Sequence, residues 1–245
     1  MKILAIMGIR EGSKGCPNKN IYPLLNKPLF TWAMSAAKKS RYINKLVIST
    51  DSPSYRQEAQ SRGIDAPFVR PKELADDNSP EILYMRHALH YLEDEENYKP
   101  DLVVRLLATV PMQMHEEIDL CIECLLNNNE YDSAVVVSES RQHPMKGLRI
   151  RVDNGRRLLL PYHSDDAREI TPIDRGQYAK SFHRSNVIAF RTSTLENTNS
   201  LTGFTCYPVP IEPCRGVDID TVDDLEYVEY LMKKRSWSEV YPNSF

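Results

Sequence analysis

The sequence contains no long hydrophobic run. None of its apolar stretches approaches the roughly eighteen consecutive residues that a membrane-spanning helix needs, so we expect no membrane partner. The net charge is only -3 at pH 7 over 245 residues. A chain so close to neutral lacks the basic surplus of a nucleic-acid-binding protein, and we expect no nucleic-acid partner. A site for an anionic ligand must therefore rely on a local group of basic residues rather than on the charge of the whole chain.

Cysteine is also scarce, and its spacing excludes two common uses. The five cysteines are an odd number without the dense pattern of a disulfide scaffold, which is typical of a reducing compartment. Cys121 and Cys124 form a Cys-x-x-Cys pair, but no second pair completes a zinc site, and their apolar neighbours recur at helical spacing. We expect a cytoplasmic protein in which both are ordinary helix residues. The chain also begins with a strand-like run rather than a signal peptide.

The N-terminal residues 1–29 carry the clearest chemistry. Residues 3–9 form a short apolar run rich in β-favouring side chains, which predicts a buried strand. The loop that follows has two glycines, which allow close approach of the backbone to a ligand. It also has three cations, namely Arg10, Lys14 and Lys19. The loop matches neither the Walker A pattern nor the dinucleotide fingerprint. It predicts a cradle for a polyanion, with a solvated surface turn as the alternative.

Strand-like and helix-like segments alternate along the rest of the chain. Strands are expected at residues 45–50, 102–107, 132–138 and 184–190, with helices after residues 28, 52 and 80. This alternation predicts an α/β fold in which helices cover both faces of a parallel sheet. Ligands of such folds gather beyond the carboxyl ends of the strands. Asp51 stands at such an end, or caps the next helix.

One segment interrupts the alternation. Residues 148–152 and 157–160 have strand character and are separated by Asp153-Asn154-Gly155, a strong signal for a β-hairpin. We expect this hairpin to leave the main sheet. Residues 162–182 are polar without a clear period, and we expect a short helix and loop there.

Two aspartates near the C-terminal end suggest a metal site. Asp218 and Asp220 flank Ile219 in a strand-like segment, so their side chains should point to the same side. Two such carboxylates repel one another unless a cation lies between them. Magnesium (Mg2+) prefers oxygen ligands and often bridges carboxylates to substrate phosphates. We therefore predict that Asp218 and Asp220 hold magnesium, whereas Asp223 and Asp224 favour the start of the next helix.

Several motifs occur in a fixed order over about residues 1–235. They are Arg10-x-Gly12-Ser13-Lys14-Gly15-x-Pro17-x-Lys19-Asn20, Lys27-Pro28-Leu29, Ser49-Thr50-Asp51-Ser52, Arg70-Pro71-x-Glu73-Leu74-Ala75-x-Asp77, Thr109-x-Pro111, His143-Pro144-x-Lys146 and Asp218-Ile219-Asp220-Thr221. This series resembles the cytidylyltransferases that make CMP-sialic acid and related CMP-activated keto sugars. The resemblance implies one three-layer α/β/α Rossmann-like nucleotidyltransferase domain over residues 1–235. It also implies a dimerisation insertion at 145–183, a tail at 236–245, and a homodimer.

The resemblance also implies a reaction and roles for particular residues. The substrates would be CTP and an α-keto acid sugar, whose anomeric hydroxyl attacks the α-phosphate and releases pyrophosphate with the help of Mg2+. Nucleotide contacts are implied for Arg10, Gly12, Ser13, Lys14, Asn20, Arg70, Asp77 and Ser79. Catalytic roles are implied for Arg10, Lys19, Lys146, Asp218 and Asp220. Contacts to the acceptor are expected from Arg105, Leu107, Thr109, Gln113, His183 and Asn186.

The acceptor side departs from the family pattern. Leu107 stands where the family usually has a glutamine, Gln113 where it has an arginine, and Val187 where a glycine follows Asn186. Arg105, a charge within an apolar strand, either faces the acceptor or pairs with a structural carboxylate. The acceptor could be sialic, legionaminic or pseudaminic acid or a relative. Two alternatives stay open: a nucleotidyltransferase for another NTP or a sugar 1-phosphate, and a non-catalytic nucleotide-binding protein.

Overall fold

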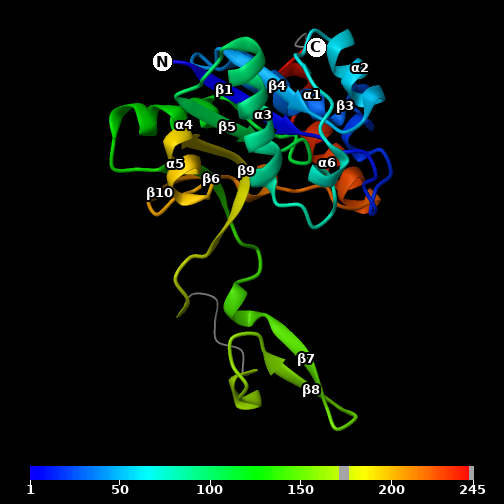
Figure 1. Ribbon diagram of the computed structural model, residues 1–245. Helices are drawn as coiled ribbons and strands as arrows, with labels where there is room; N and C mark the ends of the chain where they lie inside the picture. Colours follow the sequence, from blue (N-terminus) through cyan, green and yellow to red (C-terminus); the bar gives the residue numbers. More distant parts are fainter. Residues whose placement is uncertain (171–176, 243–245) are drawn as a thin grey trace.

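A six-stranded sheet in the order β10-β6-β9-β5-β1-β4 forms the centre of the computed structural model, which describes residues 1–170 and 177–242 (Figure 1). Its strands are β1 (Ile3–Gly8), β4 (Lys45–Ser49), β5 (Leu102–Leu106), β6 (Ser133–Glu139), β9 (Phe182–Arg191) and β10 (Cys206–Ile211). β9 runs antiparallel to β5 and β6, and the other pairs are parallel. The predicted mostly parallel sheet is confirmed, with one antiparallel strand that the alternation did not predict.

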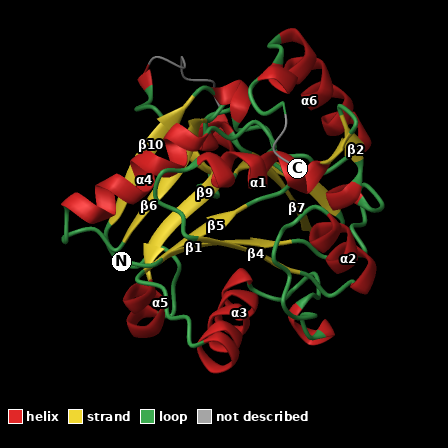
Figure 2. Ribbon diagram, turned by 90° about the horizontal axis from the view of Figure 1, so that it is seen from above, coloured by secondary structure: helices red, strands yellow, loops and turns green. Residues whose placement is uncertain are grey.

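Helices cover both faces of this sheet, as Figure 2 shows. α1 (Leu29–Lys39) and α4 (His115–Asn127) pack on one face, and α3 (Glu81–Glu96) and α5 (Thr192–Thr198) on the other. Successive strand side chains point to opposite faces, so two separate cores form. In β1, Ala5 and Met7 join the core beneath α1 and α4, whereas Leu4 and Ile6 join the core beneath α3. The predicted three-layer α/β/α architecture is confirmed.

Local capping explains where the remaining helices begin. α2 (Pro53–Ser61) is capped by Ser52, whose hydroxyl accepts a hydrogen bond from the Tyr55 N–H, so Asp51 is not the cap. α6 (Val222–Lys234) begins with a capping box between Thr221 and Asp224. The short elements are β2 (Pro23–Leu24), β3 (Lys27–Pro28) and the 3-10 helices η1 (Lys19–Ile21), η2 (Lys72–Leu74), η3 (Pro144–Lys146), η4 (Ala167–Ile170), η6 (Pro213–Arg215) and η7 (Trp237–Glu239).

The predicted hairpin forms outside the main sheet. β7 (Leu148–Asp153) pairs antiparallel with β8 (Arg156–Pro161), and the two strands extend away from the body of the molecule (Figure 1). Asn154 and Gly155 make the turn with φ angles of 47° and 78°, the left-handed conformation that a tight hairpin requires. The helix expected at 162–182 is η4, and residues 171–176 lie outside the described residues.

The C-terminal tail packs against the body. Trp237 and Tyr241 are both buried, Trp237 beside α6 and Tyr241 in the core that α1 and α4 cover. Within residues 1–170 and 177–242, none of the helices combines the length and the apolar character that crossing a membrane requires.

Candidate active site

A cavity of about 560 Å³ lies at the carboxyl ends of β1 and β5. Gly8 ends β1, Leu107 follows β5, and Asp220 enters from the segment before α6. This position agrees with the rule that ligands of α/β folds bind beyond the carboxyl ends of the strands. The predicted site residues that line this first cavity are Arg10, Ser13, Lys14, Lys19, Asn20, Arg70, Asp77, Ser79, Leu107, Thr109 and Asp220.

The N-terminal loop and the acidic segment meet at this cavity. Gly15 packs so closely on the carbonyl oxygen of Asp220 that a Cβ atom at residue 15 would collide with it. Lys19 Nζ donates to the Ile219 carbonyl oxygen (2.5 Å) and to Asp220 Oδ1 (3.1 Å). Gly12 has a φ of 83°, which a residue with a side chain rarely adopts. The structure therefore brings together two motifs about 200 residues apart in the sequence.

Asp77 forms ion pairs with two cations of this loop. Its carboxylate pairs with Arg10 (2.5 Å) and with Lys14, and these contacts hold the pKa of Asp77 below its ordinary value. Arg10 also donates to the carbonyl oxygen of Ala75 (3.2 Å). The sequence predicted that Asp77 lies in the base and ribose pocket. Asp77 lines the first cavity with its carboxylate beside two loop cations, and its place in the base and ribose pocket stays a prediction.

Arg70 supports the floor of the first cavity from a buried position. Its guanidinium donates to the carbonyl oxygens of Ile9 (3.1 Å) and Ser49 (3.3 Å) and lies 4.9 Å from the centroid of the Tyr84 ring. Burial lowers the pKa of Arg70 and raises that of Tyr84 to about 12. Asp51 Oδ1 accepts from the backbone N–H of Glu11 (3.1 Å), so Asp51 fastens the start of the loop.

A second cavity of about 400 Å³ adjoins the first, and Leu107 lines both. Its wall includes Asp218, His183 and two arginines, Arg141 and Arg184. These basic groups suit an acidic ligand that carries hydroxyls. Sequence reasoning singled out His183 but missed the two arginines. The available signal was their position beside predicted strands, since Arg141 follows β6 and Arg184 lies near the start of β9.

The structure corrects two predicted acceptor contacts. Arg105 is fully buried (0% exposed) and donates to Glu81 Oε2 and to the Asn186 carbonyl oxygen, both at 3.2 Å, so its partner is the structural carboxylate. Gln113 is buried as well, and its Nε2 donates to the carbonyl oxygens of Leu107 (2.8 Å) and of Val110. Neither side chain belongs to the described lining of the two cavities.

Two further candidates lie away from both cavity walls. The Asn186 side chain is buried, and in the described part of the chain its polar atoms have no hydrogen-bond partner. Lys146 ends η3 at the base of the hairpin and lines neither cavity as described. A role in the reaction stays a prediction for both residues.

The two motif aspartates are suited to a metal by their chemistry. Asp218 and Asp220 are exposed on either side of the fully buried Ile219, which preserves the predicted alternation although the segment joins no strand. Residues 1–170 and 177–242 contain no group of three or more His, Cys, Asp or Glu side chains arranged for a metal. Magnesium does not need such a group, because it binds one or two carboxylates and completes its shell with water and substrate phosphates. Magnesium binding by Asp218 and Asp220 stays a prediction.

The family that matches this fold and site is described as "Cytidylyltransferase", and it matches residues 4–241. The chain therefore belongs to the cytidylyltransferase family, as the motifs predicted, and it is a nucleotidyltransferase. It is similar to pseudaminic acid cytidylyltransferase of Campylobacter jejuni, with 27% identity over 236 residues, which are 95% of this chain and 97% of that protein.

Other similarities are more partial or concern the fold alone. N-acylneuraminate cytidylyltransferase of Escherichia coli is 33% identical over 141 residues, which are 58% of this chain but only 32% of that protein. The structure of CMP:2-keto-3-deoxy-manno-octonic acid synthetase complexed with CTP superposes with a TM-score of 0.70 at 16% identity, over 96% of this chain and 100% of that one. A 4-diphosphocytidyl-2C-methyl-D-erythritol synthase from Anaerococcus prevotii gives a TM-score of 0.60 at 12% identity, over 95% of this chain and 98% of that one. These structures confirm the predicted fold.

Proposed function

We propose that the protein transfers CMP from CTP to the anomeric hydroxyl of a nonulosonic acid, which is an α-keto acid sugar, and releases pyrophosphate. The observation that carries this proposal is the pair of adjoining cavities. One cavity is lined by the cationic loop, the other by arginines and a histidine, and the segment 218–220 contributes to both. An acceptor in the second cavity can thus approach a phosphate in the first, and catalysis rests on this alignment.

The first cavity is the proposed site of CTP. Arg10, Lys14 and Lys19 would meet the triphosphate and stabilise the charge that grows on the departing pyrophosphate. The phosphates must displace Asp77 from Arg10 and Lys14, because one set of cations cannot pair fully with both anions. Arg70 would hold the cavity floor beneath the nucleoside.

The second cavity is the proposed site of the acceptor. Its carboxylate would pair with Arg184 or Arg141, since guanidinium groups bind carboxylates through two parallel hydrogen bonds. We propose pseudaminic acid as the first acceptor to test, because the Campylobacter jejuni relative named for it aligns over 95% of this chain. Sialic acid is the second candidate, supported by the shorter but more identical match.

Magnesium is the proposed cofactor, held by Asp218 and Asp220 together with the phosphates of CTP. Their exposed carboxylates, one on each cavity, are the donor type that magnesium prefers. When bound there, magnesium would offset phosphate charge and lower the pKa of an oxygen ligand. Lys19 already contacts Asp220, so this lysine would hold the Asp220 carboxylate in place.

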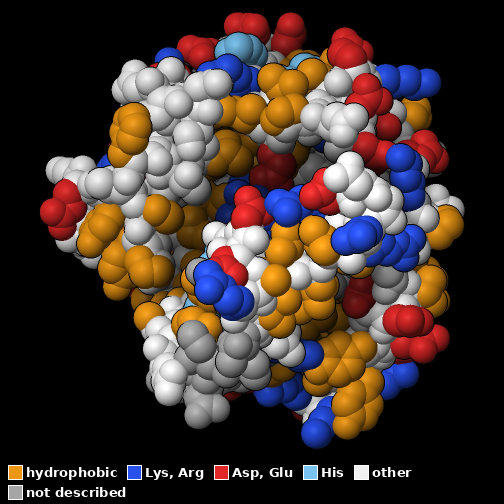
Figure 3. Space-filling view, turned by 90° about the horizontal axis from the view of Figure 1, so that it is seen from below, with side chains coloured by type: hydrophobic (Ala, Val, Ile, Leu, Met, Phe, Trp, Pro, Cys, Tyr) orange, Lys and Arg blue, Asp and Glu red, His pale blue; other side chains and the backbone are white. Residues whose placement is uncertain are grey.

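We further propose that the protein works as a homodimer in the cytoplasm, joined through the hairpin β7–β8. On β7, Ile150 and Val152 are 67% and 68% exposed and, with Leu148, point to one side of the strand. Figure 3, viewed from the end to which the hairpin extends, shows hydrophobic side chains at the surface among charged ones. A two-stranded ribbon with an open apolar face is marginal alone, and a second copy would cover it.

Pyrophosphate release tests this function. The protein is incubated with magnesium and CTP, and pseudaminic, legionaminic and sialic acids are supplied one at a time. The same acceptors are then tested with ATP, GTP and UTP, and a sugar 1-phosphate is tested with each of the four nucleotides. We expect release with CTP and a nonulosonic acid. Equal release with another nucleotide, or release only with a sugar 1-phosphate, would refute the proposal.

A further inference from the structure

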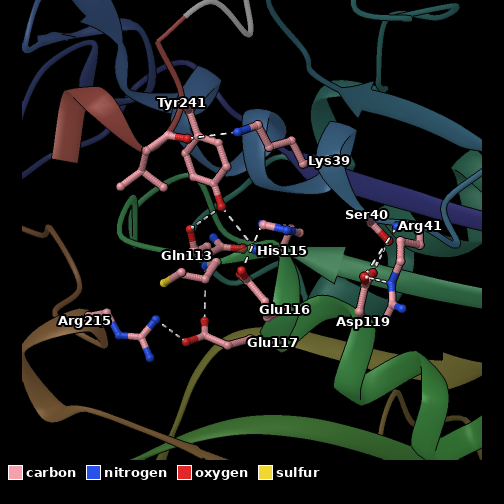
Figure 4. Close-up of polar contacts among 12 residues, drawn as sticks. Lys39, Ser40, Arg41, Gln113, His115, Glu116, Glu117, Asp119, Arg215 and Tyr241 are labelled. Atoms are coloured by element: carbon pink, nitrogen blue, oxygen red, sulfur yellow. Dashed lines mark hydrogen bonds and ion pairs between the residues drawn. The ribbon is translucent and has the colours of Figure 1, made fainter.

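Tyr241 in the C-terminal tail is completely buried (0% exposed). Its hydroxyl accepts a hydrogen bond from the His115 backbone N–H (3.1 Å) and donates to the Gln113 carbonyl oxygen (3.3 Å), as Figure 4 shows. Lys27 Nζ donates to the carbonyl oxygen of Tyr241 (2.7 Å), and Lys39 Nζ lies 5.0 Å from the centroid of the ring. The tail is therefore fixed to the turn that joins β5 to α4.

That turn, residues 107–113, forms part of the active site. The Gln113 side chain closes it by donating to the carbonyl oxygens of Leu107 (2.8 Å) and Val110 (3.0 Å). Leu107 lines both cavities and Thr109 lines the first. The carbonyl oxygen of Thr109 accepts a hydrogen bond from the Ile219 N–H (2.9 Å), between the two motif aspartates. Hydrogen bonds at both ends of the turn, together with its backbone, thus join the tail to the acidic segment.

We propose that Tyr241 is a positioning residue of the active site: through Gln113 it holds the turn 107–113 where that turn lines both cavities and meets the segment 218–220. Without the hydroxyl, the buried Gln113 carbonyl oxygen and the partly buried His115 N–H lose their partner, and the turn must shift to satisfy them. A small displacement of this turn disturbs the alignment of acceptor and nucleotide. Most contacts of the cationic loop with the nucleotide stay in place. The expected change in kcat/KM for the acceptor rests on the proposed function, whereas the expected shift of the turn 107–113 does not.

The competing explanation is that the tail only stabilises the fold. Trp237 separates the two, because it is also buried in the tail but its indole N–H has no hydrogen-bond partner in the described residues; it packs only through apolar contacts, in the cluster that holds α6 together with Met112 and Ile219. Replacing Trp237 with Phe leaves a gap in that cluster and lowers stability without removing a hydrogen bond to residues 107–113. It is the matched control for Tyr241→Phe, which removes only the hydroxyl.

The experiment compares wild type, Tyr241→Phe, Gln113→Leu and Trp237→Phe in four measurements: hydrogen–deuterium exchange, the Kd of CTP, kcat/KM for the acceptor, and the melting temperature. We expect Tyr241→Phe to speed exchange in peptides covering 107–113 and 217–220. It should lower kcat/KM for the acceptor about 5- to 10-fold, as expected when part of the free energy of the two lost hydrogen bonds serves to align the acceptor, and leave the Kd of CTP within about twofold. Gln113→Leu should reproduce this pattern, and Trp237→Phe should lower only the melting temperature.

Unchanged exchange at 107–113 in both Tyr241→Phe and Gln113→Leu would overturn the proposal, as would a loss of acceptor kcat/KM in Trp237→Phe equal to that in Tyr241→Phe. If Tyr241→Phe fails to fold, Gln113→Leu tests the same connection from the active-site end. If wild type turns over none of the acceptors, the proposed function fails, and hydrogen–deuterium exchange still decides the role of Tyr241.

Discussion

Arg105 and Glu81 form an ion pair, and we predict that removing one partner lowers the free energy of unfolding more than removing the other. Arg105 is 0% exposed inside β5, whereas the Glu81 side chain at the start of α3 is 33% exposed. Replacing Glu81 with Gln leaves a buried guanidinium without an opposite charge and close to a second arginine, Arg184, which lies 4.0 Å from Glu81. Replacing Arg105 with Met instead leaves Glu81, which can turn toward water in the first cavity.

The expected magnitudes follow from this asymmetry. An orphaned buried charge costs about 3–5 kcal/mol, which is the value we assign to Glu81→Gln. For Arg105→Met we expect about 2 kcal/mol, since methionine fills similar volume and the two hydrogen bonds lost go to an accessible carboxylate, Glu81, and to the Asn186 carbonyl oxygen. The double variant should resemble Arg105→Met alone. The coupling energy then equals the cost of Glu81→Gln in magnitude, about 3–5 kcal/mol.

Urea denaturation of the four proteins measures these differences in the free energy of unfolding. The control is Lys99→Met, which removes a surface lysine whose nearest carboxylate, on Glu93, is 3.5 Å away, and which should cost less than about 1 kcal/mol. If Arg105→Met were at least as destabilising as Glu81→Gln, or if the two single effects were additive, the assignment of Arg105 to a structural pair would fail.

Four further predictions concern the loop, the pKa of Tyr84 and the dimer. Gly15→Ala should lower kcat/KM for CTP at least about tenfold, because the new methyl collides with the Asp220 carbonyl and moves the loop; unchanged kinetics would contradict this close contact. Asp77→Asn should tighten pyrophosphate binding about threefold in calorimetry by freeing Arg10 and Lys14, and weaker binding would show that Asp77 contacts the ligand. Burial raises the pKa of Tyr84 to about 12. The contribution of Tyr84 to the free energy of unfolding is therefore complete below about pH 10 and falls by about 1.4 kcal/mol per pH unit above pH 10. Tyr84→Phe should flatten this alkaline loss of stability in denaturation curves. Ile150→Asp should convert a dimer to a monomer in light scattering, whereas a monomeric wild type would refute the hairpin interface.

Periodicity predicted most of the fold because strand, helix and turn signals are local. The run at residues 3–9 became β1, and Asp153-Asn154-Gly155 became the turn of the hairpin β7–β8. The antiparallel direction of β9 could not be predicted, since an apolar run carries no information about its neighbour's direction. The docking of Tyr241 also depends on contacts with residues far away in the sequence.

The residues that line the first cavity were predicted better than those that line the second. Loop motifs with glycines and cations fix a backbone shape and a charge together, so Arg10, Lys14 and Lys19 were found from the sequence. Acceptor residues come from strand ends, and a sequence does not show which way a strand side chain points. The resemblance therefore implied an acceptor contact for Gln113 and, as one of two alternatives, for Arg105, although both are buried.

The mass of the reaction product tests CMP transfer to a nonulosonic acid most directly. Wild type is incubated with CTP, magnesium and pseudaminic acid, and a parallel reaction contains sialic acid instead. The products are separated, and their masses are measured by mass spectrometry. We expect a CMP-linked sugar formed in a one-to-one ratio with pyrophosphate. Pyrophosphate without a CMP-linked sugar, or no product from either acid while CTP binds tightly, would contradict the transfer.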